Sequence, residues 1–289
     1  MAFSANNAFS AREWSLAHSR SLTLGPAGLL MGILNVTPDS FSDGGQLASP
    51  RDVVAQAQAM SAAAAAILDI GGESTRPGAD PVDAGTEQAR VLPAIAALRD
   101  ALPEAILSID TYRADTARKA VEAGAHIVND VWGLQREPDI AEIAASSGAG
   151  LCIMHTGRER RKLADVIDDQ LAFFDTSLAI AGKAGVRDEQ IVLDPGFGFA
   201  KDADENFMLM ARFEALHGLG FPILVGTSRK RFIGHATGRE AAADRDAGTA
   251  ATTALLRAAG AAVFRVHDVA INYDALAVAD AMIAARQRA

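Results

Sequence analysis

Short apolar runs alternate with longer segments of helical periodicity along most of the chain. The runs are rich in branched aliphatic residues and end at glycine, proline or polar positions, which is typical of buried parallel strands. Eight of them follow one another: LLMGILNV, AILDIGG, AILSIDT, HIVNDV, LCIMH, IVLDPG, PILVGTS and VFRVHD. The pattern predicts eight strand–helix units.

The helices between the runs have recognisable ends. Ser49 precedes Pro50, and Asp52 follows two residues later, so Ser49 is the expected N-cap of the first helix. The segments TARKAVEAGA and DIAEIAASSGAG each finish in glycine, as helices often do.

Two architectures fit this alternation, a closed (β/α)8 barrel and a doubly wound open sheet. Polar residues stand at the ends of nearly all the runs: Asn35, Asp110, Asn129, Asp130, His155, Asp194, Ser228 and His267. An open sheet brings only a few strand ends to its ligand crevice, whereas a barrel gathers all of them around one mouth. We therefore predict a single α/β domain, a (β/α)8 TIM-type barrel over 29–289. Residues 1–28 are predicted to be an extension with a short hairpin that closes the barrel bottom.

Composition narrows the function. Of the 289 residues, 49% are hydrophobic, which is enough for a large core, and the formal net charge of −9 argues against nucleic-acid binding. The only cysteine, Cys152, lies in an apolar run and is expected to be a packed thiol in a reducing compartment. The N-terminus lacks the pattern of a secretory signal, and no apolar stretch approaches the roughly 20 residues of a membrane span. We expect a cytoplasmic protein without a membrane partner.

The loops after the first two runs have the composition of ligand-binding segments. MGILNVTPDSFSDGG places Asn35 at a strand end, where its amide could bind a hard cation or a phosphate oxygen. GGESTRPGAD offers glycines for close backbone approach and Arg76 as a forked donor to phosphate or carboxylate.

Three acceptor side chains follow later strands. Asp110, Asn129 and Asp194 together match a flat heterocycle that carries amino and ring N–H donors. Singly, each could equally be a helix cap or a hydrogen-bonding residue inside the barrel. After Asp194, the stretch LDPGFGFAK brings Phe197 and Phe199, either of which could cover a planar ring or belong to the core.

A local basic group stands at the last two strand ends. It comprises Arg229, Lys230, Arg231, Arg265 and His267, at the place where barrels frequently bind phosphate. We read His155 as a lining or structural residue, and the sequence has no zinc-type ligand spacing.

These stretches resemble dihydropteroate synthase, the pterin-binding enzyme family of the folate pathway. The resemblance rests on MGILNVTPDSFSDGG, DIGGESTRPGA, SIDT, IVNDV, LDPGFGFAK, GTSRKRFIG and RVHDV, which occur in the family's order from residue 31 to 268. It implies an enzyme, a transferase that joins 6-hydroxymethyl-7,8-dihydropterin diphosphate to 4-aminobenzoate and releases diphosphate and 7,8-dihydropteroate. It also implies a homodimer and a target of sulfonamide mimics of 4-aminobenzoate.

The resemblance carries residue roles with it. It implies that Asp110, Asn129, Asp194 and Lys230 bind the pterin, and that Asn35, Arg265 and His267 bind the diphosphate, with Mg2+ near Asn35. The aminobenzoate site would include Thr75, Arg76, Pro77, Phe199, Lys230 and the residue after it, Arg231. Diphosphate departure before attack by the arylamine fits these groups, because Mg2+, Arg265 and His267 can absorb the leaving charge while Asp110 or Asp194 stabilises a cationic ring.

Two stretches depart from the family pattern. The chain reads MHTGRERRKLADV over 154–166, where many members have an MQGxP-like segment, and Arg231 stands where serine is common. Two rival functions share the pterin pocket. One is a corrinoid-dependent methyltransferase, which has no diphosphate to bind, and the other is a pterin carrier without turnover.

Overall fold

The structure, a computed structural model, describes residues 8–37, 49–73 and 82–288. Eight parallel strands form a ring in which neighbours follow one another in chain order from β3 to β8, and β10 pairs with both β3 and β9. A bridge between Leu193 and Ile223 joins the remaining edges and closes the barrel. The barrel strands are β3 (Leu29–Asn35), β4 (Ala65–Gly71), β5 (Ile106–Asp110), β6 (Ile127–Asp130), β7 (Gly150–Met154), β8 (Ile191–Asp194), β9 (Leu224–Val225) and β10 (Val263–Val266). The predicted barrel and its eight strands are confirmed.

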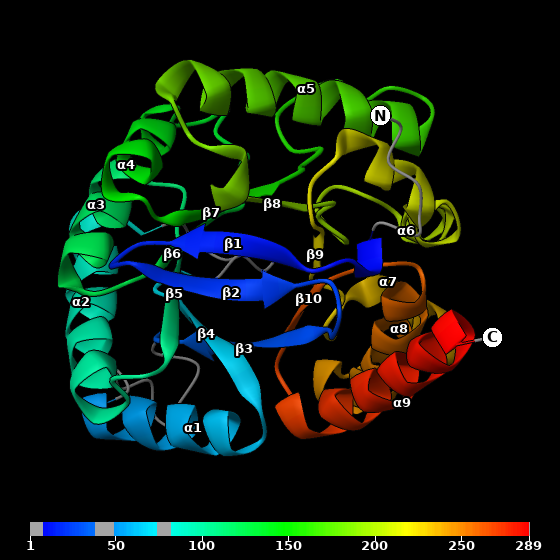
Figure 1. Cartoon of the computed structure of the whole chain (residues 1–289), viewed down its shortest axis with the longest axis horizontal. Coiled ribbons are helices and arrows are strands. Elements are labelled where there is room, and N and C mark those ends of the chain that lie inside the picture. The colour runs from blue at the N-terminus through cyan, green and yellow to red at the C-terminus, as the bar shows by residue number, and fades with distance from the viewer. Residues whose placement is uncertain (1–7, 38–48, 74–81, 289) are drawn as a thin grey trace.

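Helices surround the barrel, as Figure 1 shows. They are α1 (Pro50–Ala62), α2 (Ala84–Ala101), α3 (Ala114–Ala123), α4 (Asp139–Ser147), α5 (Val166–Ala184), α6 (Ala203–Ala211), α7 (Arg231–Thr237), α8 (Asp246–Ala258) and α9 (Val269–Arg288). Ser49 and Asp52 form a capping box at the start of α1, and α4 ends at Gly148 in the left-handed conformation. The helix ends expected at these positions are confirmed.

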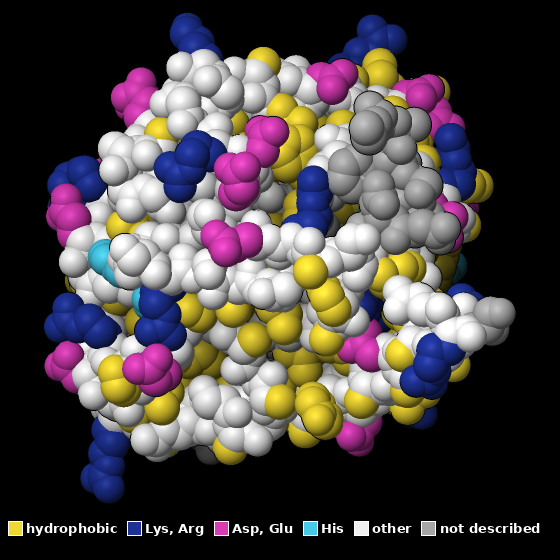
Figure 2. Space-filling view, viewed as in Figure 1, with side chains coloured by type: hydrophobic (Ala, Val, Ile, Leu, Met, Phe, Trp, Pro, Cys, Tyr) yellow, Lys and Arg dark blue, Asp and Glu magenta, His cyan; other side chains and the backbone are white. Residues whose placement is uncertain are grey.

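A two-stranded hairpin closes one end of the barrel. Strands β1 (Arg12–Leu16) and β2 (Arg20–Leu24) pair antiparallel, with Trp14 opposite Leu22. Trp14, Leu16 and Leu24 are buried in one cluster with inward-facing strand residues such as Ile67 and Ile127. The hairpin therefore plugs the amino-terminal end of the strands, as predicted. Figure 2, which looks onto this end, shows charges of both signs interspersed around the face.

The barrel interior changes from apolar to polar along the strands. Ile67, Ile106 and Ile127 belong to the apolar cluster under the hairpin. Two residues further along the same strands come Asp69, Ser108 and Asn129, all buried. Because side chains alternate between the two faces of a strand, these positions also point inward. The carboxyl end of the barrel thus has a polar interior.

Candidate active site

Arg265 on β10 connects two carboxylates at the polar end of the barrel. Its Nε donates to Asp69 Oδ2 at 2.6 Å, and its Nη2 donates to Asp110 Oδ2 at 2.7 Å. Asn129 Nδ2 donates to the same Asp69 oxygen at 3.2 Å. Side chains from four strands, β4, β5, β6 and β10, are therefore joined in one network.

Asp194 on β8 belongs to the same cluster. A Cβ placed on Gly226 would lie 3.8 Å from Asp194 Oδ2 and 4.0 Å from Arg265 Cβ, so the two side chains flank this glycine. Asp194 also accepts a hydrogen bond from the Gly196 N–H at 2.8 Å. The barrel thus brings together Asp110, Asn129, Asp194 and Arg265, which the sequence placed on separate strands.

Burial changes the acidity of these groups. Loss of water raises the pKa of Asp110 to about 7 against the opposing effect of Arg265, and it raises the pKa of Asp194 to about 6. Burial on its own would lower the pKa of Arg265, but the charges of Asp69 and Asp110 raise it above its usual value. Arg265 is accordingly a permanent cation beside Asp110 and Asp194, whose carboxyl groups can hold or release a proton near neutrality.

Lys230 lies against the ring of Phe199. Its Nζ is 4.0 Å from the ring centroid, and the guanidinium of Arg158 is 4.7 Å from the same centroid. Burial, followed by the positive charge of Arg265, lowers the pKa of Lys230 to about 8. Phe197 instead is fully buried and stacks on Phe232, so only Phe199 of the two aromatic candidates lies beside charged groups of the site.

The basic residues after β9 and β10 do not share one role. His267 is oriented by Ser228, whose Oγ lies 2.9 Å from His267 Nδ1 and accepts the His267 backbone N–H at 3.1 Å. Arg229 forms two hydrogen bonds of 2.7 Å with Asp246, and Arg231 is exposed at the start of α7. Within the expected anion site, the geometry therefore favours Lys230, Arg265 and His267 over Arg229.

Asn35 stands at the end of β3 beside the carboxylate cluster. A Cβ on Gly71 would lie 3.3 Å from Asn35 Oδ1 and 3.7 Å from Asp110 Oδ2, so both oxygens border the same space. Mg2+ prefers such hard oxygen ligands and often uses only one or two from the protein together with substrate phosphates. The donor set at Asn35 fits a metal bound in this way.

Thr75, Arg76 and Pro77, expected at the aminobenzoate site, lie outside the described residues, as does Phe41. The residues on either side of 74–81 are held by Arg113, whose Nη2 donates to Glu73 Oε2 at 2.7 Å and to the Val82 carbonyl oxygen.

Sequence reasoning assigned no role to Asp69 or Arg113. For Asp69 a signal existed, since it lies two residues before Gly71 in a strand and therefore shares the inward face. Nothing comparable marks Arg113, because its partners Glu73 and Val82 lie far away in the sequence.

Known proteins resemble this chain over most of its length. Residues 31–267 match the model of the family described as pterin binding enzyme. A dihydropteroate synthase of Bacillus subtilis is 46% identical over 241 residues, which are 83% of this chain and 84% of that protein. The dihydropteroate synthase of Escherichia coli is 40% identical over 264 residues, or 89% of this chain and 93% of that protein.

Solved structures agree with these relatives. A dihydropteroate synthase of Clostridium difficile, crystallised in the presence of pteroic acid, has a TM-score of 0.86 and 43% identity over 90% of this chain and 98% of that one. The enzyme of Xanthomonas albilineans with 4-aminobenzoic acid has a TM-score of 0.88 and 40% identity over 94% of this chain and 99% of that one.

Proposed function

Because the chain belongs to the family of pterin binding enzymes, we propose how its residues perform the reaction of a dihydropteroate synthase. The enzyme is a transferase of folate biosynthesis. It condenses 6-hydroxymethyl-7,8-dihydropterin diphosphate with 4-aminobenzoate and releases 7,8-dihydropteroate and diphosphate. The observation that carries the assignment of residues is the cluster in which Arg265 joins Asp69 and Asp110 beside Asp194 and Lys230.

The acceptors of this cluster bind the pterin. Asp110, Asn129 and Asp194 supply carboxylate and amide oxygens to the amino and ring N–H groups of the bicycle. They are buried, so each hydrogen bond forms away from competing water and an unmatched ligand leaves a costly unpaired group. Because of that cost, the site selects a pterin over ligands whose donors do not match these acceptors.

The cations bind the diphosphate. Arg265 and His267 take the phosphate oxygens, and Asn35 would supply its amide oxygen to Mg2+ that binds with the substrate. When bound there, Mg2+ neutralises charge that develops on the leaving diphosphate. Arg265 already carries a fixed positive charge, so it needs no proton transfer to assist departure.

The reaction exchanges a C–O bond for a C–N bond. The bond between the pterin methylene and the diphosphate oxygen breaks, and its electron pair leaves with the oxygen. Ionised Asp110 or Asp194 stabilises the positive charge that spreads over the ring. The amine lone pair of 4-aminobenzoate then forms the C–N bond, and the nitrogen loses one proton, which the released diphosphate or water takes up.

The second substrate lies against Phe199 and Lys230. The ring of Phe199 offers an apolar surface for the benzene ring, and Lys230 supplies positive charge next to it. We keep Thr75, Arg76 and Pro77 as further members of this pocket on the strength of the family resemblance alone, and with them the expectation that sulfonamides compete for it.

Diphosphate release in the presence of 4-aminobenzoate, measured with and without Mg2+, tests the proposal. We expect release that requires both 4-aminobenzoate and Mg2+, with one dihydropteroate formed per diphosphate. Pterin binding without turnover would identify a carrier, and Mg2+-independent binding of a reduced folate without diphosphate chemistry would identify a corrinoid methyltransferase.

We also propose a homodimer and a cytoplasmic location. The packed helices α8 and α9 expose large apolar side chains, including Leu255 and Val278, which supports association. The buried free thiol of Cys152 suits a reducing compartment. Within the described ranges, no helix has the length and apolarity that a bilayer crossing needs.

A further inference from the structure

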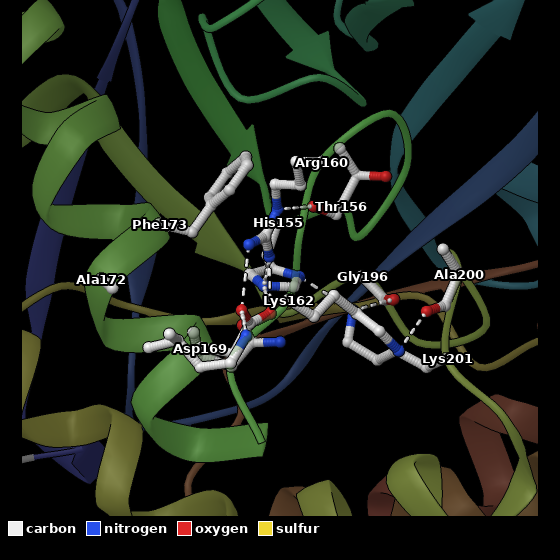
Figure 3. A network of polar contacts seen from close by, with 12 residues as sticks. His155, Thr156, Arg160, Lys162, Asp169, Ala172, Phe173, Gly196, Ala200 and Lys201 are labelled. Carbon is white, nitrogen blue, oxygen red and sulfur yellow. Dashed lines mark hydrogen bonds and ion pairs between the residues drawn. The ribbon is translucent and has the colours of Figure 1, made fainter. Parts of the chain in front are cut away.

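A buried lysine links the loop after β7 to the loop after β8, outside the cluster of the active site (Figure 3). Lys201 is 9% exposed, and its Nζ donates to the Gly196 carbonyl oxygen at 2.9 Å and is hydrogen-bonded with His155 Nδ1 at 2.9 Å. In the described part of the chain it forms no ion pair with a carboxylate, although Asp169 and Asp194 act on it from further away. Burial lowers the pKa of Lys201 to about 7.

His155 connects Lys201 to the ion pair formed by Arg160 and Asp169. Burial lowers the pKa of His155 to about 4, so the ring is neutral, and each ring nitrogen has a close cationic partner: Lys201 Nζ lies 2.9 Å from Nδ1, and Arg160 Nη2 lies 2.8 Å from Nε2. That nitrogen lies 3.0 Å from Asp169 Oδ2, which also accepts from Arg160 Nη2 at 2.5 Å. Arg160 belongs to the basic stretch that departs from the family pattern, and its second contact with Asp169 fixes this stretch over α5.

Gly196 connects the same lysine to the active site. Its N–H donates to the Asp194 carboxylate at 2.8 Å, while its carbonyl oxygen accepts from Lys201 and from the Phe199 N–H at 3.1 Å. Gly196 has a φ of +65°, and a Cβ there would lie 1.9 Å from the His155 carbonyl oxygen, so no other residue fits. Lys201 thus holds a residue that is hydrogen-bonded to both Asp194 and Phe199.

A buried lysine without a carboxylate partner is an expensive way to join two loops, because burial disfavours its charged form. Removing its hydration costs several kcal/mol, and apolar residues of similar volume often serve stability as well or better. The hydrogen bonds of Lys201 have a geometric effect that an apolar side chain cannot supply, because they fix the direction of the Gly196 carbonyl group.

We infer that Lys201 is a positioning residue of the condensation, which acts through Gly196 to hold the Asp194 carboxylate and the Phe199 ring in place for the two substrates. The inference rests on the proposed roles of Asp194 and Phe199. It extends to His155, which orients Lys201 and is in turn oriented by Asp169 and Arg160.

Lys201→Met tests the inference, and Lys162→Met is its matched control. Lys162 bridges the same two loops through the Ala200 carbonyl oxygen at 2.8 Å and Glu205, but it contacts neither Gly196 nor His155. We expect Lys201→Met to raise KM for both substrates about tenfold or more with a native circular dichroism spectrum, and Lys162→Met to leave both KM values within twofold. If a lysine served stability alone, its replacement by methionine would lower the midpoint of thermal unfolding without changing KM.

Two results would overturn the inference. One is a folded Lys201→Met enzyme with both KM values within twofold of wild type, and the other is an equal increase in KM in the Lys162→Met control. If Lys201→Met does not fold, Lys201→Leu carries the same test, since it also removes both hydrogen bonds. Calorimetric titration of Asp194→Asn with pterin tests the premise separately from the inference. Unchanged pterin binding by this variant would refute the role of Asp194, whatever the result for Lys201→Met.

Discussion

At the scale of single residues, the active site depends on a cation held between two buried carboxylates. Arg265 contacts Asp69 with Nε and Asp110 with Nη2, so its guanidinium plane is fixed before any substrate arrives. Both carboxylates are almost completely excluded from water, so each depends on the positive charge of Arg265 beside it. The pair of contacts therefore couples the stability of the barrel to its capacity for binding diphosphate.

Arg265→Ala should destabilise the protein strongly and in a pH-dependent manner. Breaking a buried ion pair costs about 3 to 5 kcal/mol, because it leaves an uncompensated charge. Without Arg265 the native-state pKa of Asp110 rises further above its unfolded value, so the native state binds more protons than the unfolded state and stability falls as pH rises. Urea unfolding at pH 5 and pH 8 should show the larger loss at pH 8; equal losses would contradict the ion-pair argument.

The rate of condensation should depend on pH through three of these groups. With pKa values of about 6 for Asp194 and about 7 for Asp110, ionisation of the carboxylates raises kcat/KM between pH 6 and 7. Loss of the proton from Lys230, whose pKa is about 8, lowers kcat/KM above that pH. In Lys230→Arg the fall at high pH should disappear, since arginine stays charged, even though the rate is lower. An unchanged alkaline limb would remove Lys230 from the profile.

At the scale of elements, strand ends and helix caps were predictable because they depend on neighbours in the chain. The polar residues at or just after most strand ends and the Ser49 cap follow from alternation and from the first turn of a helix. Contacts that depend on how loops lie against each other were not predictable. Arg229 turns to Asp246 and Lys201 to His155 only because the barrel brings these segments together.

The hairpin β1–β2 should contribute stability without affecting catalysis. Trp14 is buried at the amino-terminal end of the barrel, and its Nε1 donates to the Gln190 carbonyl oxygen at 2.8 Å. Trp14→Ala should cost about 3 to 5 kcal/mol in the free energy of unfolding, because it opens a cavity and leaves that oxygen unpaired. Both KM values should stay at wild-type levels, as in the exposed control Glu13→Ala, which should also keep its stability. A raised KM in Trp14→Ala would show that the two ends are coupled.

At the scale of the whole molecule, barrel closure assigns packing to the amino-terminal end of the strands and ligand binding to the carboxyl end. The hairpin and the apolar cluster fill the amino-terminal end, so the polar residues at the carboxyl end can be arranged for binding. The net charge of −9 does not prevent anion binding, because Lys230 and Arg265 are half-buried at the site and act over short distances. Their low exposure also keeps them less sensitive to salt than surface charges are.

The same organisation makes the outer helices available for association. Leu255 on α8 is 63% exposed and Val278 on α9 is 71% exposed, which is unfavourable for a helix pair that faces water. Light scattering should give the wild type twice the chain mass of 30.1 kDa, and Leu255→Glu with Val278→Glu should shift the mass toward the monomer. Leu163→Glu, at a residue 52% exposed on the loop after β7, should leave the dimer intact. Because every described residue assigned to the site belongs to a single barrel, the monomeric variant should keep its kcat. A wild-type monomer, or a double variant that remains dimeric, would show that this helix pair is not the interface.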